Sequence, residues 1–310
     1  GDHISTAISV AKKVGILTKN EQAISCNDLA NFSEQQLKEE INNFTVFARA
    51  TSEDKLRIVK ILKEQGENVL VTGDSINDSY ALREADIGCS MGLTATDMVN
   101  YSADLVITNN KFSSLFSAIC ESYNTVENIK RGIHFIVTSS IIEALIIFLG
   151  SIIFKAIPFS IPGLLLLNTI FITLIISAFA FEKHRKDNLN KQSENFLNLR
   201  SIVSAILPSI IISTFSLIAF GNTLKTSYNS ATSSMFLVLI AGLIIHSFSV
   251  NSDKTLFSAN SLTFRAIPII ALAIIIFTLI CTLTPVGVIL SFEALSSIKI
   301  WLILLCGVSV

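Results

Sequence analysis

Asp74 and Asp78 are two carboxylates four residues apart, and this spacing could place both on one metal or phosphate site. They follow a short apolar run, Asn68 to Val71, that predicts a buried parallel strand, and the residues after it predict a helix start. Both side chains can then lie above the carboxyl end of the strand, where open α/β sheets bind ligands. Carboxylates with an amide between them, here Asn77, suit a hard cation such as Mg2+, and a phosphoryl group is its natural companion.

A simpler interpretation of these residues is a turn at Gly73 and Asp74 followed by a helix cap. The longer segment favours chemistry, because Val71 to Leu82 resembles the TGDGxNDxPAL signature of the P-type cation-transporting ATPases. Two positions differ from that signature. Ser75 replaces a glycine, which could disturb a close approach or a positive φ, and Tyr80 replaces a rigid proline. We therefore expect the Mg2+ carboxylates to be present, in a loop whose conformation differs from that of the family.

Other segments resemble the same family in the same order. Phe47 to Ala50, followed by Asp54 to Val59, resembles the family's FAR…xxK segment, which implies that Lys55 touches the phosphoryl group. The Lys55 ammonium could stabilise the negative charge that develops on a phosphoryl group. Without the flanking match, a solvated lysine on a helix would be the simpler interpretation. Gly1 and Asp2 resemble the end of a TGD segment near phosphate and nucleotide. The cofactor-binding positions that the resemblance implies are Gly1, Asp2 and Gly73.

Composition divides the chain into two parts. Its 310 residues have a mean hydropathy of +0.61 and a net charge of -1, which is too apolar for an ordinary soluble enzyme. Residues 1 to about 130 are mixed and charged, and strands alternate with helices there, which favours a doubly wound parallel sheet. The resemblance implies a partial haloacid-dehalogenase-like (HAD-like) sheet in this part. The predicted class is therefore α/β plus an all-α membrane bundle.

The predicted organisation has three segments. Residues 1–111 are the C-terminal part of a cytoplasmic phosphorylation domain, 112–132 a stalk helix, and 133–310 a membrane domain resembling helices 5 to 10, with the last one truncated. Both ends of the chain look cut. Strands are predicted at 43–47, 68–71, 87–90 and 105–107, helices at 3–14, 53–63 and 78–84, and a polar surface insertion with a helix at 21–42. Membrane spans of about 20 residues are predicted at 133–154, 161–181, 201–220, 233–250 and 266–284, with a sixth beginning near Ile298.

Polar residues inside the predicted spans mark a candidate cation path, since charge in a membrane is costly and usually functional. Glu143 is the only carboxylate well inside a span. Resemblance to the calcium-pump branch implies that Glu143, Asn168 and Ser140 are transport residues, whereas a structural glutamate and an interhelical amide are the simpler interpretations. The family's Thr and Asp fall at Phe171 and Ile172. One carboxylate would hold Ca2+ poorly, which leaves a monovalent cation, a proton-coupled site, weaker divalent binding or lost transport.

The resemblance implies an aspartyl-phosphate cycle with Mg2+ and ATP as cofactors. The expected partners are a transported cation, the lipid bilayer and a missing N-terminal half of the pump, and no basic stripe indicates nucleic acid. Because no DKTGT segment is present, we expect this chain alone neither to hydrolyse ATP nor to transport. The alternatives are a pseudo-pump or regulatory membrane subunit, a lipid-flippase-like P-type ATPase, and a membrane-anchored HAD-like phosphatase, which would need a DxDxT segment. Basic loops predict that the soluble part is cytoplasmic. A bacterial plasma membrane is the expected location of the whole protein.

Overall fold

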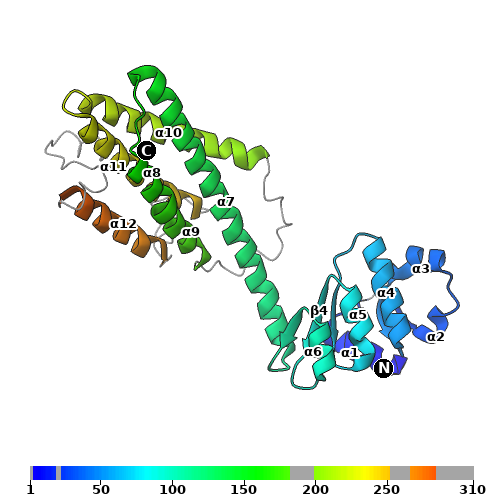
Figure 1. Ribbon diagram of the computed structural model, residues 1–310. Helices are drawn as coiled ribbons and strands as arrows, with labels where there is room; N and C mark the ends of the chain where they lie inside the picture. The colour runs from blue at the N-terminus through cyan, green and yellow to red at the C-terminus, as the bar shows by residue number, and fades with distance from the viewer. Residues whose placement is uncertain (1–2, 19–21, 182–198, 252–265, 284–310) are drawn as a thin grey trace. The chain divides into compact units, whose positions relative to one another are not determined.

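The computed structural model describes residues 3–18, 22–181, 199–251 and 266–283 (Figure 1). The chain divides into two compact units, Gly1–Ile119 and Cys120–Val310. Helices and small parallel sheets make up the first unit, and helices make up the described part of the second. The predicted phosphate-site residues Gly1 and Asp2 and the predicted sixth span lie outside the described residues.

The first unit begins with helix α1 (Ile4–Val14), which ends at Gly15 in the left-handed conformation that glycine adopts readily. Strands β1 (Gln22–Ser25) and β2 (Phe44–Ala48) then pair in parallel. Parallel strands need a crossover connection, and short helices supply it here. These are α2 (Cys26–Leu29), α3 (Glu34–Glu40) and the 3-10 turn η1 (Ile41–Asn43).

The prediction of a polar surface insertion at residues 21–42 is wrong in an instructive way. The segment contributes strand β1 to a sheet, and its Leu29 and Leu37 side chains are fully buried. Both leucines pack with Ile24, Ile41 and Ile61 in one apolar cluster. Few apolar residues lie in this segment, but the tertiary structure buries most of them, and local composition does not show this.

A second sheet carries the motif strand. Strands β3 (Leu70–Gly73), β4 (Ile87–Met91) and β5 (Leu105–Ile107) are parallel and adjacent in that order. The motif strand therefore ends two residues later than predicted, and its helix is preceded by a 3-10 turn. Because all three strands run in one direction, their carboxyl ends share one edge. The connecting elements are the turn η2 (Ile76–Asp78) and the helices α5 (Ser79–Glu84) and α6 (Asp97–Ser102), while α4 (Ser52–Glu64) precedes the sheet.

Long apolar helices form the second unit. Helix α7 (Phe112–Phe154) has 43 residues and is about 65 Å long at about 1.5 Å per residue, as predicted for one uninterrupted helix. Four described helices are long and apolar enough to cross a membrane, which indicates an integral membrane protein. These four are Phe112–Phe154, Ile161–Ala180, Val203–Thr223 and Tyr228–Val250.

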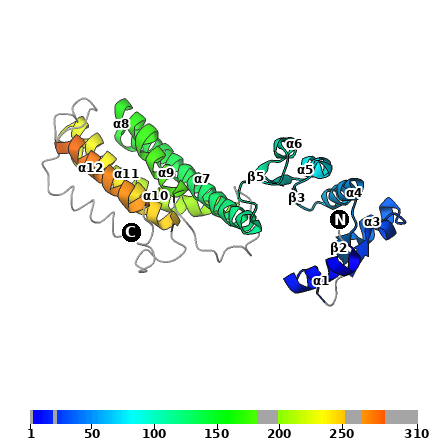
Figure 2. The ribbon, with the colours of Figure 1, turned by 90° about the horizontal axis from the view of Figure 1, so that it is seen from below.

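The second of these spans changes its helical type in the middle. It consists of α8 (Ile161–Leu166), a π-helical segment η3 (Leu167–Ile172) and α9 (Thr173–Ala180). The remaining helices are α10 (Leu199–Thr223), α11 (Tyr228–Asn251) and α12 (Ala266–Leu283). Helices α9, α11 and α12 lie side by side (Figures 1 and 2), around a core that includes fully buried phenylalanines.

Candidate functional sites

The first unit brings together two of the predicted catalytic residues, Lys55 and Asp78. Strand β2 ends at Ala48, and helix α4 then begins after Thr51, whose side chain and that of Asp54 cap the helix reciprocally. This start places Lys55 in the first turn of α4. Its Nζ atom lies 2.5 Å from Asp78 Oδ1, although the two residues are 23 positions apart in sequence.

Asp78 is held from both sides. Its side chain is only 7% exposed, and its Oδ2 atom accepts a hydrogen bond from Ser75 Oγ at 2.9 Å, with the Ser75 backbone N–H at 3.4 Å. Burial by itself would raise the pKa of the Asp78 carboxyl, but the hydrogen bonds from Lys55 and Ser75 together outweigh burial and hold the pKa below its usual value. The Asp78 carboxylate is therefore ionised at neutral pH, with both oxygens engaged.

Gly73 makes this arrangement sterically feasible. A Cβ atom at this position would lie 2.6 Å from Asp78 Cβ, closer than real Cβ contacts allow. The absence of a side chain lets the end of β3 approach the carboxylate directly. The role of Gly73 that the geometry shows is thus close packing on Asp78.

The substitution at Ser75 does not disturb the backbone as expected. Ser75 has φ -109° and ψ 154°, an extended conformation that any residue adopts, so the loop does not need glycine here. Its hydroxyl instead donates a hydrogen bond to the Asp78 carboxylate, a contact that the sequence analysis did not predict. The spacing of a serine three residues before an aspartate is the signal that could have found it. Tyr80 is accommodated at the surface, with 71% of the residue exposed in the first turn of α5.

The fit of Mg2+ to this edge depends mainly on Asp74. Asp74 and Asn77 are exposed just after β3, whereas both oxygens of Asp78 already accept hydrogen bonds. Mg2+ usually takes one or two carboxylates and keeps several waters, so an exposed carboxylate with an amide nearby suits it. Within the described ranges there is no cluster of three or more His, Cys, Asp and Glu side chains that could form a complete metal site. The sequence predicts Asp74 and Asp78 together as Mg2+ carboxylates. In the structure Asp74 is exposed, whereas both oxygens of Asp78 accept hydrogen bonds from Lys55 and Ser75.

The second unit brings together two of the three predicted transport residues. Asn168 Nδ2 donates a hydrogen bond to Glu143 Oε2 at 3.1 Å and another to the Leu164 carbonyl at 3.2 Å. Glu143 Oε1 is buried and has no hydrogen-bond partner among the described residues. Ser140 lies three residues before Glu143 on α7 and is exposed. Glu143 thus presents one engaged oxygen and one available oxygen.

Asn168 lies in the π-helical segment, where the regular hydrogen bonding changes. Thr173 Oγ1 donates to the Asn168 carbonyl at 3.2 Å, across five residues rather than the usual four. Single π turns within α-helices occur often at functional sites, because they release backbone groups from the regular ladder. The amide and the altered backbone therefore occur at the same place in the span.

Phe171 and Ile172 belong to the apolar core. They are only 1% and 7% exposed. The Phe171 ring lies 6.0 Å from that of Phe236 and 5.8 Å from that of Phe277, between centroids. The two positions where the family resemblance implies oxygen ligands are thus filled by side chains packed against neighbouring helices. Glu143 and Asn168 have no polar support from these two residues.

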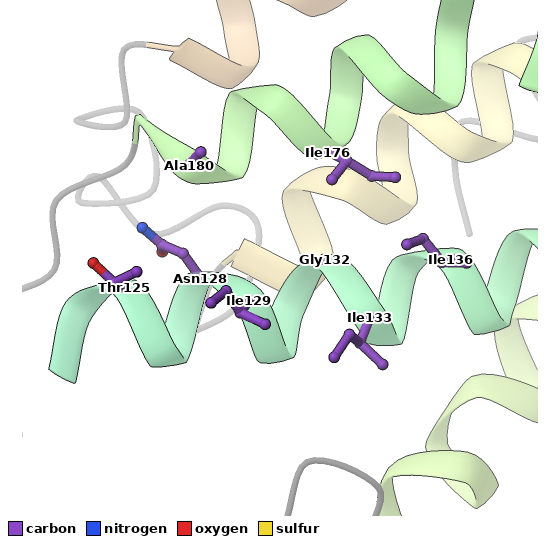
Figure 3. Close-up of a pocket in the computed structure, with 8 residues that line it drawn as sticks. All are labelled: Thr125, Asn128, Ile129, Gly132, Ile133, Ile136, Ile176 and Ala180. Carbon is purple, nitrogen blue, oxygen red and sulfur yellow. The ribbon is translucent and has the colours of Figure 1, made fainter. Parts of the chain in front are cut away.

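An apolar groove lies elsewhere in the second unit, between α7 and α9 (Figure 3). Its volume is about 290 Å3. Figure 3 shows isoleucine side chains along most of it and the polar Thr125 and Asn128 near one end. Such walls suit an apolar group rather than an ion, so the groove is separate from the Glu143 site. It is lined by Thr125, Asn128, Ile129, Gly132, Ile133, Ile136, Ile176 and Ala180.

Comparison with known proteins defines the class of this chain. Residues 156–310 match the family model described as cation transporting ATPase, C-terminus. The chain is 31% identical over 285 residues to calcium-transporting ATPase 1 of Bacillus cereus, covering 85% of this chain and 32% of that protein. It is 30% identical over 318 residues to a probable cation-transporting P-type ATPase of Mycoplasma genitalium, covering 93% of this chain and 36% of that protein.

The chain belongs to the cation-transporting P-type ATPases and matches their C-terminal part, which confirms the resemblance inferred from Val71 to Leu82. Calcium-transporting ATPase of Bacillus subtilis is a further relative, 29% identical over 269 residues, which are 84% of this chain and 30% of that protein. The chain thus spans about a third of the length of these relatives.

Proposed function

We propose that this chain is the C-terminal part of an ATP-driven cation pump with an aspartyl-phosphate cycle. In this proposal its first unit is part of a cytoplasmic HAD-like phosphorylation domain, and its second unit holds half of the membrane cation path. The observation that carries the proposal is the Lys55–Asp78 pair at the strand edge, next to the exposed Asp74. An ammonium that can stabilise the phosphoryl oxygens and a carboxylate that can hold Mg2+ are two of the groups that phosphoryl transfer uses.

The residues at this edge of the first unit have different proposed roles. Asp74, with Asn77 nearby, would hold Mg2+, which supplies positive charge to the phosphoryl oxygens. Asp78 holds the Lys55 ammonium toward the edge, where it stabilises negative charge on the group being transferred. Ser75 holds Asp78 in turn. Gly1 and Asp2 are further proposed contacts to phosphate and nucleotide.

In this proposal the phosphorylated aspartate comes from outside this chain. The sequence holds no DKTGT segment, and Asp74 and Asp78 are assigned to Mg2+ and to Lys55. We therefore propose that the chain alone forms no phosphoenzyme. Acid-stable labelling of the purified chain by radiolabelled ATP would contradict this.

In the membrane, Glu143 and Asn168 are the proposed cation ligands, with Ser140 on the same face of α7. Glu143 Oε1 is a buried acceptor, and the π-helical turn at Asn168 loosens the backbone beside it. The relatives are named for calcium transport. Ca2+ takes six to eight oxygen ligands. Because Glu143 is the one carboxylate well inside the described membrane helices, we propose a monovalent or weakly held divalent cation unless other helices of the pump complete the site.

A second candidate function is a pseudo-pump, a membrane subunit that keeps the fold without transport. Phe171 and Ile172 favour it, because they put apolar core where the resemblance implies ligands. A lipid-flippase-like pump is a lesser alternative, since Glu143 with its bound amide is more typical of cation transport.

The experiment is ion-stimulated ATPase activity of the complete pump, measured with Ca2+, Mn2+, Na+ and K+ in turn. We expect one ion to stimulate the wild type and Glu143→Gln to lose that stimulation while keeping the basal rate. Glu121→Gln, which lies on the same helix, is the matched control and should respond like the wild type. A folded wild-type pump that no ion stimulates would support the pseudo-pump instead.

A further inference from the structure

Two histidines from different helices lie close together in the second unit. The rings of His134 on α7 and His246 on α11 have centroids 5.8 Å apart and planes at 36°. His246 is only 7% exposed and stacks on Phe135, with centroids 5.9 Å apart and planes at 19°. Neither histidine has a part in the proposed Glu143 site, which lies nine residues further along α7, or about 13 Å.

The ring nitrogens of this pair are incompletely satisfied. His134 Nε2 lies 3.0 Å from Ser204 Oγ, within hydrogen-bond distance, so α10 holds this side of the ring. His134 Nδ1 and His246 Nε2 are both buried, and neither has a hydrogen-bond partner in the part of the chain that the structure describes. A buried polar atom without a partner costs free energy, so two of them on adjacent rings point to a ligand.

The separation of the rings suits one shared metal ion. Imidazole nitrogens bind such ions at about 2.0–2.1 Å, which would place the centres of two rings roughly 5 to 6.5 Å apart. One nitrogen of a metal-bound histidine is normally held by a second group, as Ser204 holds His134 here. Imidazoles favour zinc and copper, whereas calcium and magnesium need oxygen ligands.

Two basic residues, Lys130 and Arg131, lie about one turn before His134 on α7. Arg131 lies one turn before His134 on α7, and its Nε atom is 3.5 Å from Glu127, so that positive charge is paired. Helix α11 contains no charged residue. A cation at the two imidazoles would therefore meet no charged side chain from α11, and the Arg131 charge is offset by Glu127.

We propose that His134 and His246 bind one nitrogen-preferring d-block metal ion, zinc or copper in type, at a site separate from the transport path. Such an ion would join α7 to α11, with its remaining coordination positions taken by water. Ser204 is a positioning residue for this site, because it orients the His134 ring without binding the metal.

The site can be tested on the purified chain in detergent micelles with Zn2+ as the probe. We expect the wild type to bind one more Zn2+ than His134→Gln or His246→Gln, and Ser204→Ala to bind the same number with affinity lowered roughly 10- to 100-fold. His3→Gln is the control, since His3 is exposed in the first unit and should not affect this ion. Because the five cysteines are unchanged in every variant, their contribution cancels in the comparison.

A Co2+ visible spectrum provides an independent readout that does not depend on the histidine variants being well folded. Nitrogen and oxygen coordination gives weak d–d bands, whereas thiolate coordination adds intense charge-transfer bands. We expect a component of the first kind in the wild type that excess Zn2+ removes and excess Ca2+ leaves. Equal Zn2+ stoichiometry in wild type and folded variants, or a wild-type Co2+ spectrum with thiolate bands alone, would overturn the proposal.

Discussion

Replacing Lys55 with methionine would leave the Asp78 carboxylate buried without its cation. The Asp78 side chain is 7% exposed, so water can replace the lost interaction only in part, and Ser75 would remain as the described donor. Removing one partner of a fully buried ion pair costs about 3–5 kcal/mol. Lys55 itself is 42% exposed, which screens its charge and lowers the expected loss to about 1–3 kcal/mol, the range of a hydrogen bond to a charged group.

Hydrogen exchange measured by mass spectrometry can read this loss locally in the full chain. A destabilisation of about 1–3 kcal/mol corresponds to exchange roughly 5- to 150-fold faster in β3 and α5, after correction for intrinsic rates. Lys38→Met is the matched control, because Lys38 lies 2.5 Å from Glu64 in a pair whose side chains are 44% and 57% exposed. Water screens such an exposed pair, so we expect exchange in the Lys38 variant to stay close to that of the wild type.

The effect should also depend on pH with a defined sign. The pKa of Asp78 is lowered in the folded protein, so the pair stabilises the fold above the unfolded carboxyl pKa of about 3.9 and loses its effect as pH falls through the folded pKa. The difference between wild type and Lys55→Met should therefore be largest near neutral pH and shrink below about pH 4. Equal effects of the Lys55 and Lys38 variants at neutral pH would refute the reasoning.

Two packing predictions can be measured with the same exchange assay. Gly88→Ala would place a Cβ atom 2.5 Å from the Leu82 carbonyl oxygen, a backbone atom that cannot easily move, and we expect about 1–3 kcal/mol of destabilisation in β4. Gly132→Ala is its control, since the added atom meets only Ile176 Cγ2 at 3.6 Å; an equal loss there would contradict the steric argument. Leu37→Ala removes a fully buried side chain and should cost about 2–5 kcal/mol, read as faster exchange in β1 and β2. Unchanged exchange there would show that the cluster around Leu37 does not stabilise this sheet.

Much of the secondary structure follows from the sequence alone. Helix α4 was predicted at 53–63 and is found at Ser52–Glu64, because a capping box and a spaced apolar face are local signals. Helix α7 was predicted as one long helix and is found as Phe112–Phe154. The motif around Asp74 also identified the family, since a long specific string needs no knowledge of distant contacts.

Tertiary structure alone decided which of those residues meet. Lys55 reaches Asp78 across 23 positions, and Asn168 reaches Glu143 across 25. Local composition predicted a surface insertion at residues 21–42, whereas tertiary packing buries Leu37 in this segment. The physical reason is that periodicity and capping act within a few residues, whereas a buried ion pair depends on how separate elements pack and on which groups that packing removes from water.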